Sequence, residues 1–186
     1  RRAGDVIPEV VTSIPERRSG SEIEWSLDKR CPCGDFDIVY IKDEKVPRCS
    51  GRYDCKISKK EMLIYFASKS GLDIEGLGRE TVETLIANKL VENFEDFYSL
   101  TYEELISLPQ WKEKKTKNLL EAIEKSKNSE QEKLLPALGI RYVGKQTSKL
   151  LVNTFGSIKD IFDASSDEIN NIPVSYTHLT LPTIAE

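Results

Sequence analysis

The four cysteines of this 186-residue chain all lie within one short segment. One residue separates Cys31 from Cys33, fifteen separate Cys33 from Cys49, and five separate Cys49 from Cys55. Two pairs of thiolates, each on a tight turn, can surround Zn²⁺ tetrahedrally with bonds of about 2.3 Å. Because four thiolates leave no position for water, the spacing predicts a structural zinc site in residues 31–60. The alternative is four reduced cysteines without a metal, since the first pair has one spacer where two are usual.

Two glycine turns form the second group of residues that can do chemistry. Residues 74–79 read Ile-Glu-Gly-Leu-Gly-Arg, and residues 140–145 read Ile-Arg-Tyr-Val-Gly-Lys. Glycine lets the backbone approach a phosphate closely, and the amides of the next helix then point at the anion. Such contacts hold a nucleic-acid backbone without reading its sequence. The residues predicted to contact DNA are Gly76, Gly78, Arg79, Lys112, Lys114, Arg141, Gly144 and Lys145.

A third turn, at residues 108–112, is degenerate. It reads Leu-Pro-Gln-Trp-Lys and has no glycine, although Lys112, Lys114 and Lys115 supply positive charge. We expect Trp111 to be a packing residue and not a platform for base stacking, because nothing around it resembles a single-strand groove.

The turns belong to a repeat. Ile74, Leu108, Ile140 and Ile172 recur at steps of 34, 32 and 32 residues. Apolar or small residues recur eight, eleven and twelve positions after the first three of these. They are Val82, Thr116 and Ser148, then Leu85, Leu119 and Leu151, then Ile86, Leu120 and Val152. A period of this length predicts stacked helical units, none of which buries its apolar face alone.

A longer repeat supports the same interpretation. Residues 94–108 match residues 158–172 at an offset of 64, with Phe97 paired to Ile161 and Leu105 paired to Ile169. Both copies contain a capping-box pattern, which predicts a helix start in each. The patterns are Thr101-x-x-Glu104 and Ser165-x-x-Glu168.

The composition narrows the function classes. The chain has 27 Lys and Arg against 31 Asp and Glu, and residues 1–60 hold 13 of the former and 11 of the latter. This balance argues against a binder that relies on a broad basic surface, and favours backbone amides with a few placed cations. No run approaches the roughly 18 apolar residues of a membrane helix, and no secretory signal follows Arg1-Arg2. Since the chain begins with Arg1 and not Met, we expect a piece of a longer protein.

Three stretches differ from the helical part. Residues 1–15 hold short β-branched runs broken by Gly and Pro, and predict the end of a β domain. Residues 16–30 are polar and predict a linker with Trp25 as an anchoring aromatic. Residues 174–186 lack the glycine turn that the repeat predicts, and we interpret them as an atypical, non-native tail, with native interaction sequence as the alternative. His178 lies there, so it receives no role.

In this order the motifs resemble the C-terminal half of bacterial NAD-dependent DNA ligases over residues 1–173. The opening Arg-Arg-Ala-Gly-Asp-Val-Ile-Pro resembles the end of that family's OB domain, and the four cysteines resemble its zinc finger. Residues 72–78 resemble its first helix-hairpin-helix, and residues 118–127 and 137–144 its second and third. The resemblance implies a mainly α fold: a tandem helix-hairpin-helix domain over residues 61–173, preceded by a small zinc-ribbon module and a remnant β (OB) segment.

The resemblance also implies the chemistry of the longer protein. A lysine in a Lys-x-Asp-Gly motif takes AMP from NAD, AMP passes to the 5′-phosphate at a nick, and the 3′-hydroxyl displaces it with the help of Mg²⁺. This sequence contains no Lys-x-Asp-Gly, so we expect no catalytic residue in it and no activity alone. Its implied role is to bind nicked double-stranded DNA during replication and repair. We expect a monomer in the bacterial cytoplasm, associated with the nucleoid.

Two other function classes remain open at this stage. One is a non-enzymatic helix-hairpin-helix module of a repair or recombination protein, which would lack Lys-x-Asp-Gly upstream of Arg1. The other is a protein that binds another protein through its acidic helical half, and it would show no salt-dependent affinity for DNA.

Overall fold

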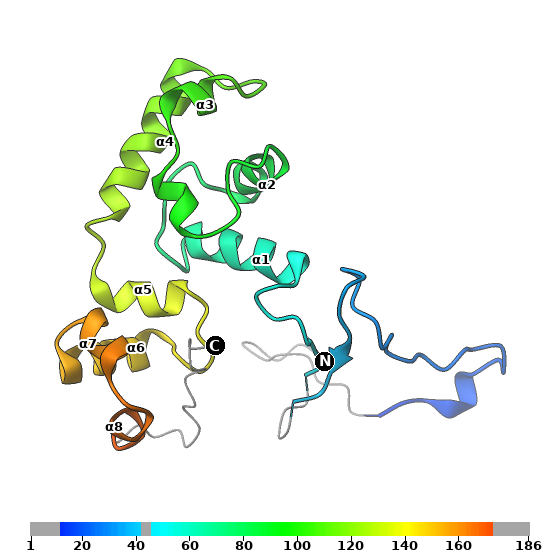
Figure 1. Cartoon of the computed structure of the whole chain (residues 1–186). Coiled ribbons are helices and arrows are strands. Elements are labelled where there is room, and N and C mark those ends of the chain that lie inside the picture. Colours follow the sequence, from blue (N-terminus) through cyan, green and yellow to red (C-terminus); the bar gives the residue numbers. More distant parts are fainter. Residues whose placement is uncertain (1–11, 42–45, 173–186) are drawn as a thin grey trace, which may run out of the picture.

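The computed structural model describes residues 12–41 and 46–172 (Figure 1). These residues form eight α-helices and one two-stranded sheet, which confirms the mainly helical prediction. Most of the predicted β segment 1–15, the hairpin expected after Ile172 and the tail 174–186 lie outside the described residues.

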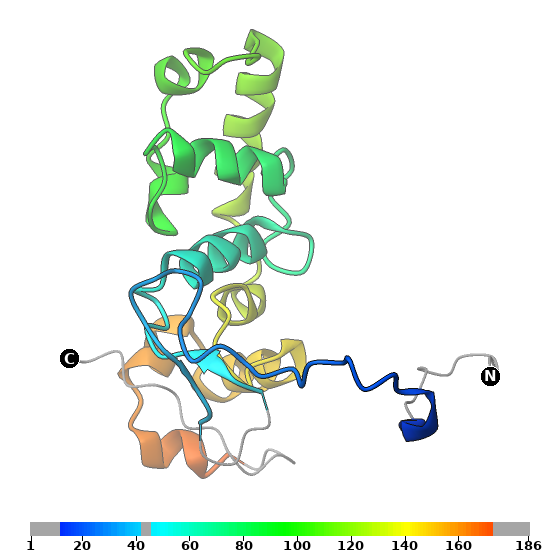
Figure 2. The same cartoon turned by 90° about the vertical axis from the view of Figure 1, so that its right-hand side faces the viewer.

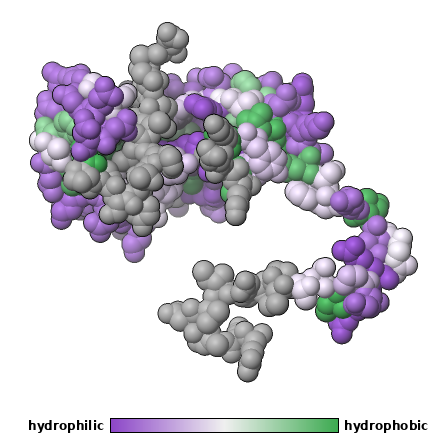
Figure 3. Space-filling model, turned by 90° about the horizontal axis from the view of Figure 1, so that it is seen from below, coloured by the Kyte–Doolittle hydropathy of each residue, from purple (hydrophilic) through white to green (hydrophobic). Residues whose placement is uncertain are grey.

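The described chain begins as an extended segment that runs away from the helical body (Figures 1 and 3). Its one regular element is a short 3-10 helix, η1, at Pro15–Arg17, and every residue from 12 to 26 is exposed. Trp25 has 79% of its surface exposed, so the expectation of an anchoring aromatic is wrong. No other part of the described chain packs around the indole.

The four cysteines lie in a small module, residues 31–55, that is held by backbone hydrogen bonds. Strand β1, Ile38–Val39, pairs antiparallel with β2, Arg48–Cys49, so that Ile38 lies opposite Cys49. A separate antiparallel bridge pairs Asp37, just before β1, with Arg30. We call these residues the cysteine module.

The first helix starts directly after the cysteine module, with no linker between them. Helix α1, Lys56–Ala67, begins five residues before residue 61, where we expected the helical domain to start. It follows directly after Cys55, which is its N-cap. The later elements are α2 Arg79–Ala87, η2 Glu95–Tyr98, α3 Tyr102–Ile106, α4 Glu113–Ser126, α5 Gln131–Ala137, α6 Lys145–Phe155, α7 Ile158–Asp163 and α8 Ser166–Asn170. The pairs α1–α2, α3–α4 and α5–α6 are stacked along one direction of the molecule (Figures 1 and 2).

The helices share two neighbouring apolar cores. One lies among α1 to α4, and in it the Phe66 ring of α1 packs against the rings of Phe94 and Phe97. The other lies among α5 to α8. The pairs predicted from the 64-residue offset occupy equivalent places. Phe97 and Leu105 are fully buried in the first core, and Ile161 and Ile169 are buried in the second.

Three equivalent positions of the shorter repeat are buried to the same extent. Val82, Thr116 and Ser148 are each 0% exposed, and the leucines three residues later in α2, α4 and α6 are also buried. Both predicted capping boxes are formed, at the starts of α3 and α8. Among the described residues, no helix has both the length and the apolar character needed to cross a membrane.

Thr116 lies at the repeat position with the least favourable polar environment. Its Oγ1 is buried and has no hydrogen-bond partner among the described residues, whereas the Ser148 hydroxyl donates to the backbone oxygen of Glu132 at 2.6 Å. Val82 shows that an apolar β-branched residue fits this position. We therefore predict that Thr116→Val raises the free energy of unfolding by about 1 kcal/mol, because it removes an unsatisfied buried hydroxyl without changing volume much.

Urea unfolding followed by circular dichroism measures this change. Ser148→Ala is the matched control, and it should lower stability by about 1 kcal/mol because it leaves the Glu132 carbonyl without its donor. A loss of stability in Thr116→Val would show that its hydroxyl has a partner in solution.

Candidate metal centre and hairpin interface

The four predicted ligands come together in the cysteine module. The Sγ atoms of Cys31, Cys33, Cys49 and Cys55 all lie within 4.8 Å of one another, and those of Cys31 and Cys55 are 3.9 Å apart. Tetrahedral ligands at about 2.3 Å from a zinc ion lie ~3.8 Å from each other. The four sulfurs therefore fit a tetrahedral thiolate site, and no described His or carboxylate joins the cluster.

The electrostatics of the cluster favour a bound cation. Desolvation, with hydrogen bonds and charge from neighbouring thiols, raises the pKa of Cys49 to about 12. Burial also acts to raise the pKa of Cys55, but hydrogen bonds from the hydroxyl and backbone amide of Ser58, together with those from the thiols of Cys49 and Cys33, lower that pKa to about 6. One thiolate thus forms readily and opposes ionisation of the next. A divalent cation removes this repulsion, because its charge stabilises all four thiolates.

Each cysteine pair lies on a turn that contains a glycine, and the two glycines have different structural roles. Gly34 has φ +85° and donates its N–H to the Cys31 oxygen at 2.9 Å, which closes the first turn. Gly51, in the second turn, does not have a left-handed backbone. A Cβ there would overlap the Phe36 ring, so close packing and not turn geometry requires glycine at this position.

The three hairpins share one backbone design despite different sequences. In each, an N–H donates to the carbonyl oxygen three residues earlier, at 3.1 to 3.2 Å. The residue before that donor has φ between +63° and +89°, and the donor side chain is buried. The left-handed residues are Gly76, Gln110 and Tyr142, and the buried residues are Leu77, Trp111 and Val143. Trp111 is therefore a packing residue, as predicted, and Lys115 Nζ lies 4.1 Å from its ring centroid.

Each hairpin ends at a helix N-cap that lacks a side-chain cap. Gly78, Lys112 and Gly144 are the N-caps of α2, α4 and α6, and all three are exposed. By contrast, α3, α7 and α8 are capped by the hydroxyls of Thr or Ser. The first amides of α2, α4 and α6 thus point outward without a side-chain acceptor, where the helix dipole favours an anion.

Neither the backbone conformation nor internal packing requires glycine at positions 78 and 144. Their φ values are −69° and −85°, which any residue adopts, and a Cβ on either meets no atom within 4 Å. Gly76 differs, because its φ is +89° and its Cβ position lies 3.4 Å from Leu119 Cδ1. The left-handed backbone therefore favours glycine at Gly76, whereas the two N-cap glycines leave open space above helix amides that have no side-chain cap.

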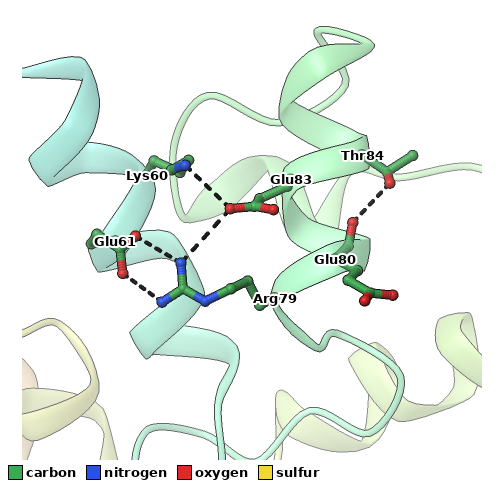
Figure 4. A network of polar contacts seen from close by, with 6 residues as sticks. All are labelled: Lys60, Glu61, Arg79, Glu80, Glu83 and Thr84. Carbon is green, nitrogen blue, oxygen red and sulfur yellow. Dashed lines mark hydrogen bonds and ion pairs between the residues drawn. The ribbon is translucent and has the colours of Figure 1, made fainter. Parts of the chain in front are cut away.

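Arg79 is placed differently from the other predicted DNA contacts. Its guanidinium donates to both carboxylate oxygens of Glu61 at 2.7 Å, and it lies 3.7 Å from Glu83, which also pairs with Lys60 (Figure 4). Hydrogen bonds from Arg79 hold the pKa of Glu61 below its usual range. This network ties α1 to α2, so the Arg79 side chain faces carboxylates in this structure.

The first two hairpins meet at a groove of about 1400 Å³. Three predicted residues line it together: Gly76, Lys112 and Lys114. The other polar residues of the lining include both signs of charge: Asp73, Glu75, Lys115, Asn118, Glu121, Lys125, Ser126, Asn128, Ser129, Glu130 and Lys133. Of these, the sequence had singled out only Lys115, for its positive charge. The helical spacing of 114, 118, 121 and 125 was the available signal, since it places these residues on one face of α4.

Charge is distributed unevenly over the hairpins. Residues 74–80 contain two carboxylates and one arginine, whereas residues 140–146 contain Arg141, Lys145 and no acidic residue. Lys145 is exposed, and the Arg141 guanidinium carbon lies 5.2 Å from the Tyr142 ring centroid. The third hairpin is thus more electropositive than the first.

Comparison with known proteins agrees with this geometry. Residues 133–174, which include the third hairpin, match the helix-hairpin-helix motif. Over 92% of its length the chain is 43% identical to a DNA ligase of Geobacter sulfurreducens and 44% identical to one of Geobacter metallireducens. Over 93% it is 40% identical to a DNA ligase of Pelotomaculum thermopropionicum. The chain is related to one segment of DNA ligases. It spans about a quarter of the length of these relatives.

Gly76 and Gly78 should differ in how much they contribute to stability, because only Gly76 has a left-handed backbone. We predict that Gly76→Ala lowers the free energy of unfolding by about 1–2 kcal/mol, because alanine is strained at φ +89°. Gly78→Ala should change it by less than about 1 kcal/mol, since a poorer N-cap is offset by a less flexible unfolded chain. Urea unfolding of the two variants measures the difference, and equal losses would contradict the assignment.

Proposed function

We propose that this chain is the DNA-binding part of an NAD-dependent DNA ligase. The observation that carries the proposal is the open N-cap pair Gly78 and Gly144, each leaving bare helix amides toward solvent within a chain 40–44% identical to DNA ligases. Backbone amides at helix starts bind phosphate of any sequence, which suits an enzyme that must act at breaks anywhere in DNA.

The ligand we propose is nicked double-stranded DNA, held by its sugar-phosphate backbone. The proposed contacts are Gly76, Gly78, Lys112, Lys114, Arg141, Gly144 and Lys145. Arg79 is the exception, and it reaches DNA only if a phosphate displaces Glu61. Adenylation by NAD and Mg²⁺-assisted phosphoryl transfer would then depend on residues beyond this chain, so the chain alone would be inactive. We propose that it acts as a monomer in the bacterial cytoplasm, at the nucleoid, in replication and repair.

The ligase relatives support this function over a non-enzymatic hairpin module or a protein-binding one, because the similarity covers the cysteine module and the hairpins together. For the metal we propose structural Zn²⁺, held by the four cysteines. The all-thiolate donor set and the sulfur spacing are typical of such a site.

The zinc proposal predicts one zinc ion per chain by elemental analysis of the purified protein. Cys33→Ser should lose the zinc, and the segment 31–55 should then become accessible to protease, because it has almost no apolar core of its own. Circular dichroism should still show the helices, whose cores lie elsewhere. Protein that is free of zinc but has an ordered cysteine module would contradict the proposal.

The DNA proposal predicts that Gly78→Val and Gly144→Val each weaken binding to nicked duplexes of any sequence, by about tenfold. A valine side chain would occupy the space above the amides, and its Cβ would meet no atom of the described residues within 4 Å. Fluorescence anisotropy at low salt measures the affinity, and thermal unfolding serves as the folding control. Lys145→Ala should reduce the slope of affinity against salt by about one phosphate contact. Unchanged affinity in both valine variants would remove the hairpin assignment.

A further inference from the structure

The third hairpin differs from the other two in the residue at its tip. The left-handed position is glycine in the first hairpin, glutamine in the second and tyrosine in the third. Tyr142 has φ +63°, a conformation that an aromatic L-residue rarely adopts, and its side chain is 57% exposed. The ring is exposed and belongs to neither of the two apolar cores of the described residues.

The residues around Tyr142 indicate the chemistry of a ligand at this tip. Gly144, the open N-cap, follows two residues later, and Lys145 is exposed beside it. Arg141 donates from Nη2 to the Tyr142 hydroxyl at 3.2 Å and lies over the ring, so a cation holds the ring in place. The tip therefore combines an apolar surface with the amides and positive charge that we propose bind a phosphate.

We infer that Tyr142 packs its ring against a deoxyribose of duplex DNA, next to the phosphate bound at the start of α6. This inference rests on the proposed function. Two residues of chain span at most about 7 Å, so the ring lies within reach of the sugars that flank a phosphate at Gly144. Sugar contacts carry no sequence information, in keeping with a binder of any DNA sequence. The left-handed tyrosine is thus a DNA contact that the hairpin keeps at the expense of backbone strain.

The test uses variants that suit the left-handed backbone but lack the ring. Tyr142→Gly and Tyr142→Asn should weaken binding to a nicked duplex by about tenfold, in the range known for aromatic contacts to nucleotides. Because tyrosine is uncharged, the slope of affinity against salt should stay that of the parent chain, unlike the slope of Lys145→Ala. Tyr142→Phe keeps the ring and should bind within about twofold of the parent.

Gln110→Gly is the matched control, because it makes the same backbone change in the second hairpin and should leave affinity unchanged. Thermal unfolding of both Tyr142 variants should stay within a few degrees of the parent, since glycine and asparagine adopt this conformation easily.

Two results would overturn the inference while leaving the proposed function standing. One is parental affinity in both ringless variants when Gly144→Val still binds weakly. The other is a reduced salt slope in those variants, which would show that Tyr142 acts only by positioning Arg141. If the parent chain itself bound no duplex DNA, the proposed function would fail instead.

Discussion

The structure depends on a turn that is anchored by one buried side chain. In each hairpin Leu77, Trp111 or Val143 points into the core while the residue before it takes a left-handed backbone. The next residue then starts a helix at the surface, so its amides face solvent. Because helices this short bury too little apolar surface alone, the same anchors also hold neighbouring units together. Folding and the exposure of these helix amides thus depend on the same few residues.

This arrangement explains how an acidic chain can suit a polyanionic ligand. The net charge is −4, and the first hairpin carries more carboxylates than cations. Amide dipoles at helix starts do not depend on net charge, and they act over short range where a phosphate makes contact. Cations are needed only at a few places, and they gather on α4 and the third hairpin. Arg79 instead neutralises carboxylates between α1 and α2.

The cysteine module joins this helical body through one residue. Cys55 is both a member of the sulfur cluster and the N-cap of α1, so the position of the cluster is fixed to the first helix. The module has two short strands and no apolar core cluster among the described residues. Its four buried or half-buried thiols lie close enough to hold a metal ion, which would cross-link the module in addition to its backbone hydrogen bonds.

The sequence by itself determined the features that are local or periodic. Cysteine spacing predicted the four-sulfur cluster, the repeat predicted the fully buried Val82, Thr116 and Ser148, and Thr and Ser patterns predicted two capping boxes. Only the tertiary structure decided which side chains face which. It turned Arg79 toward Glu61, left Trp25 in solvent, and put Lys125 in a groove with the first hairpin. Spacing along a chain fixes what one helix presents, whereas partners from distant segments depend on how the helices pack.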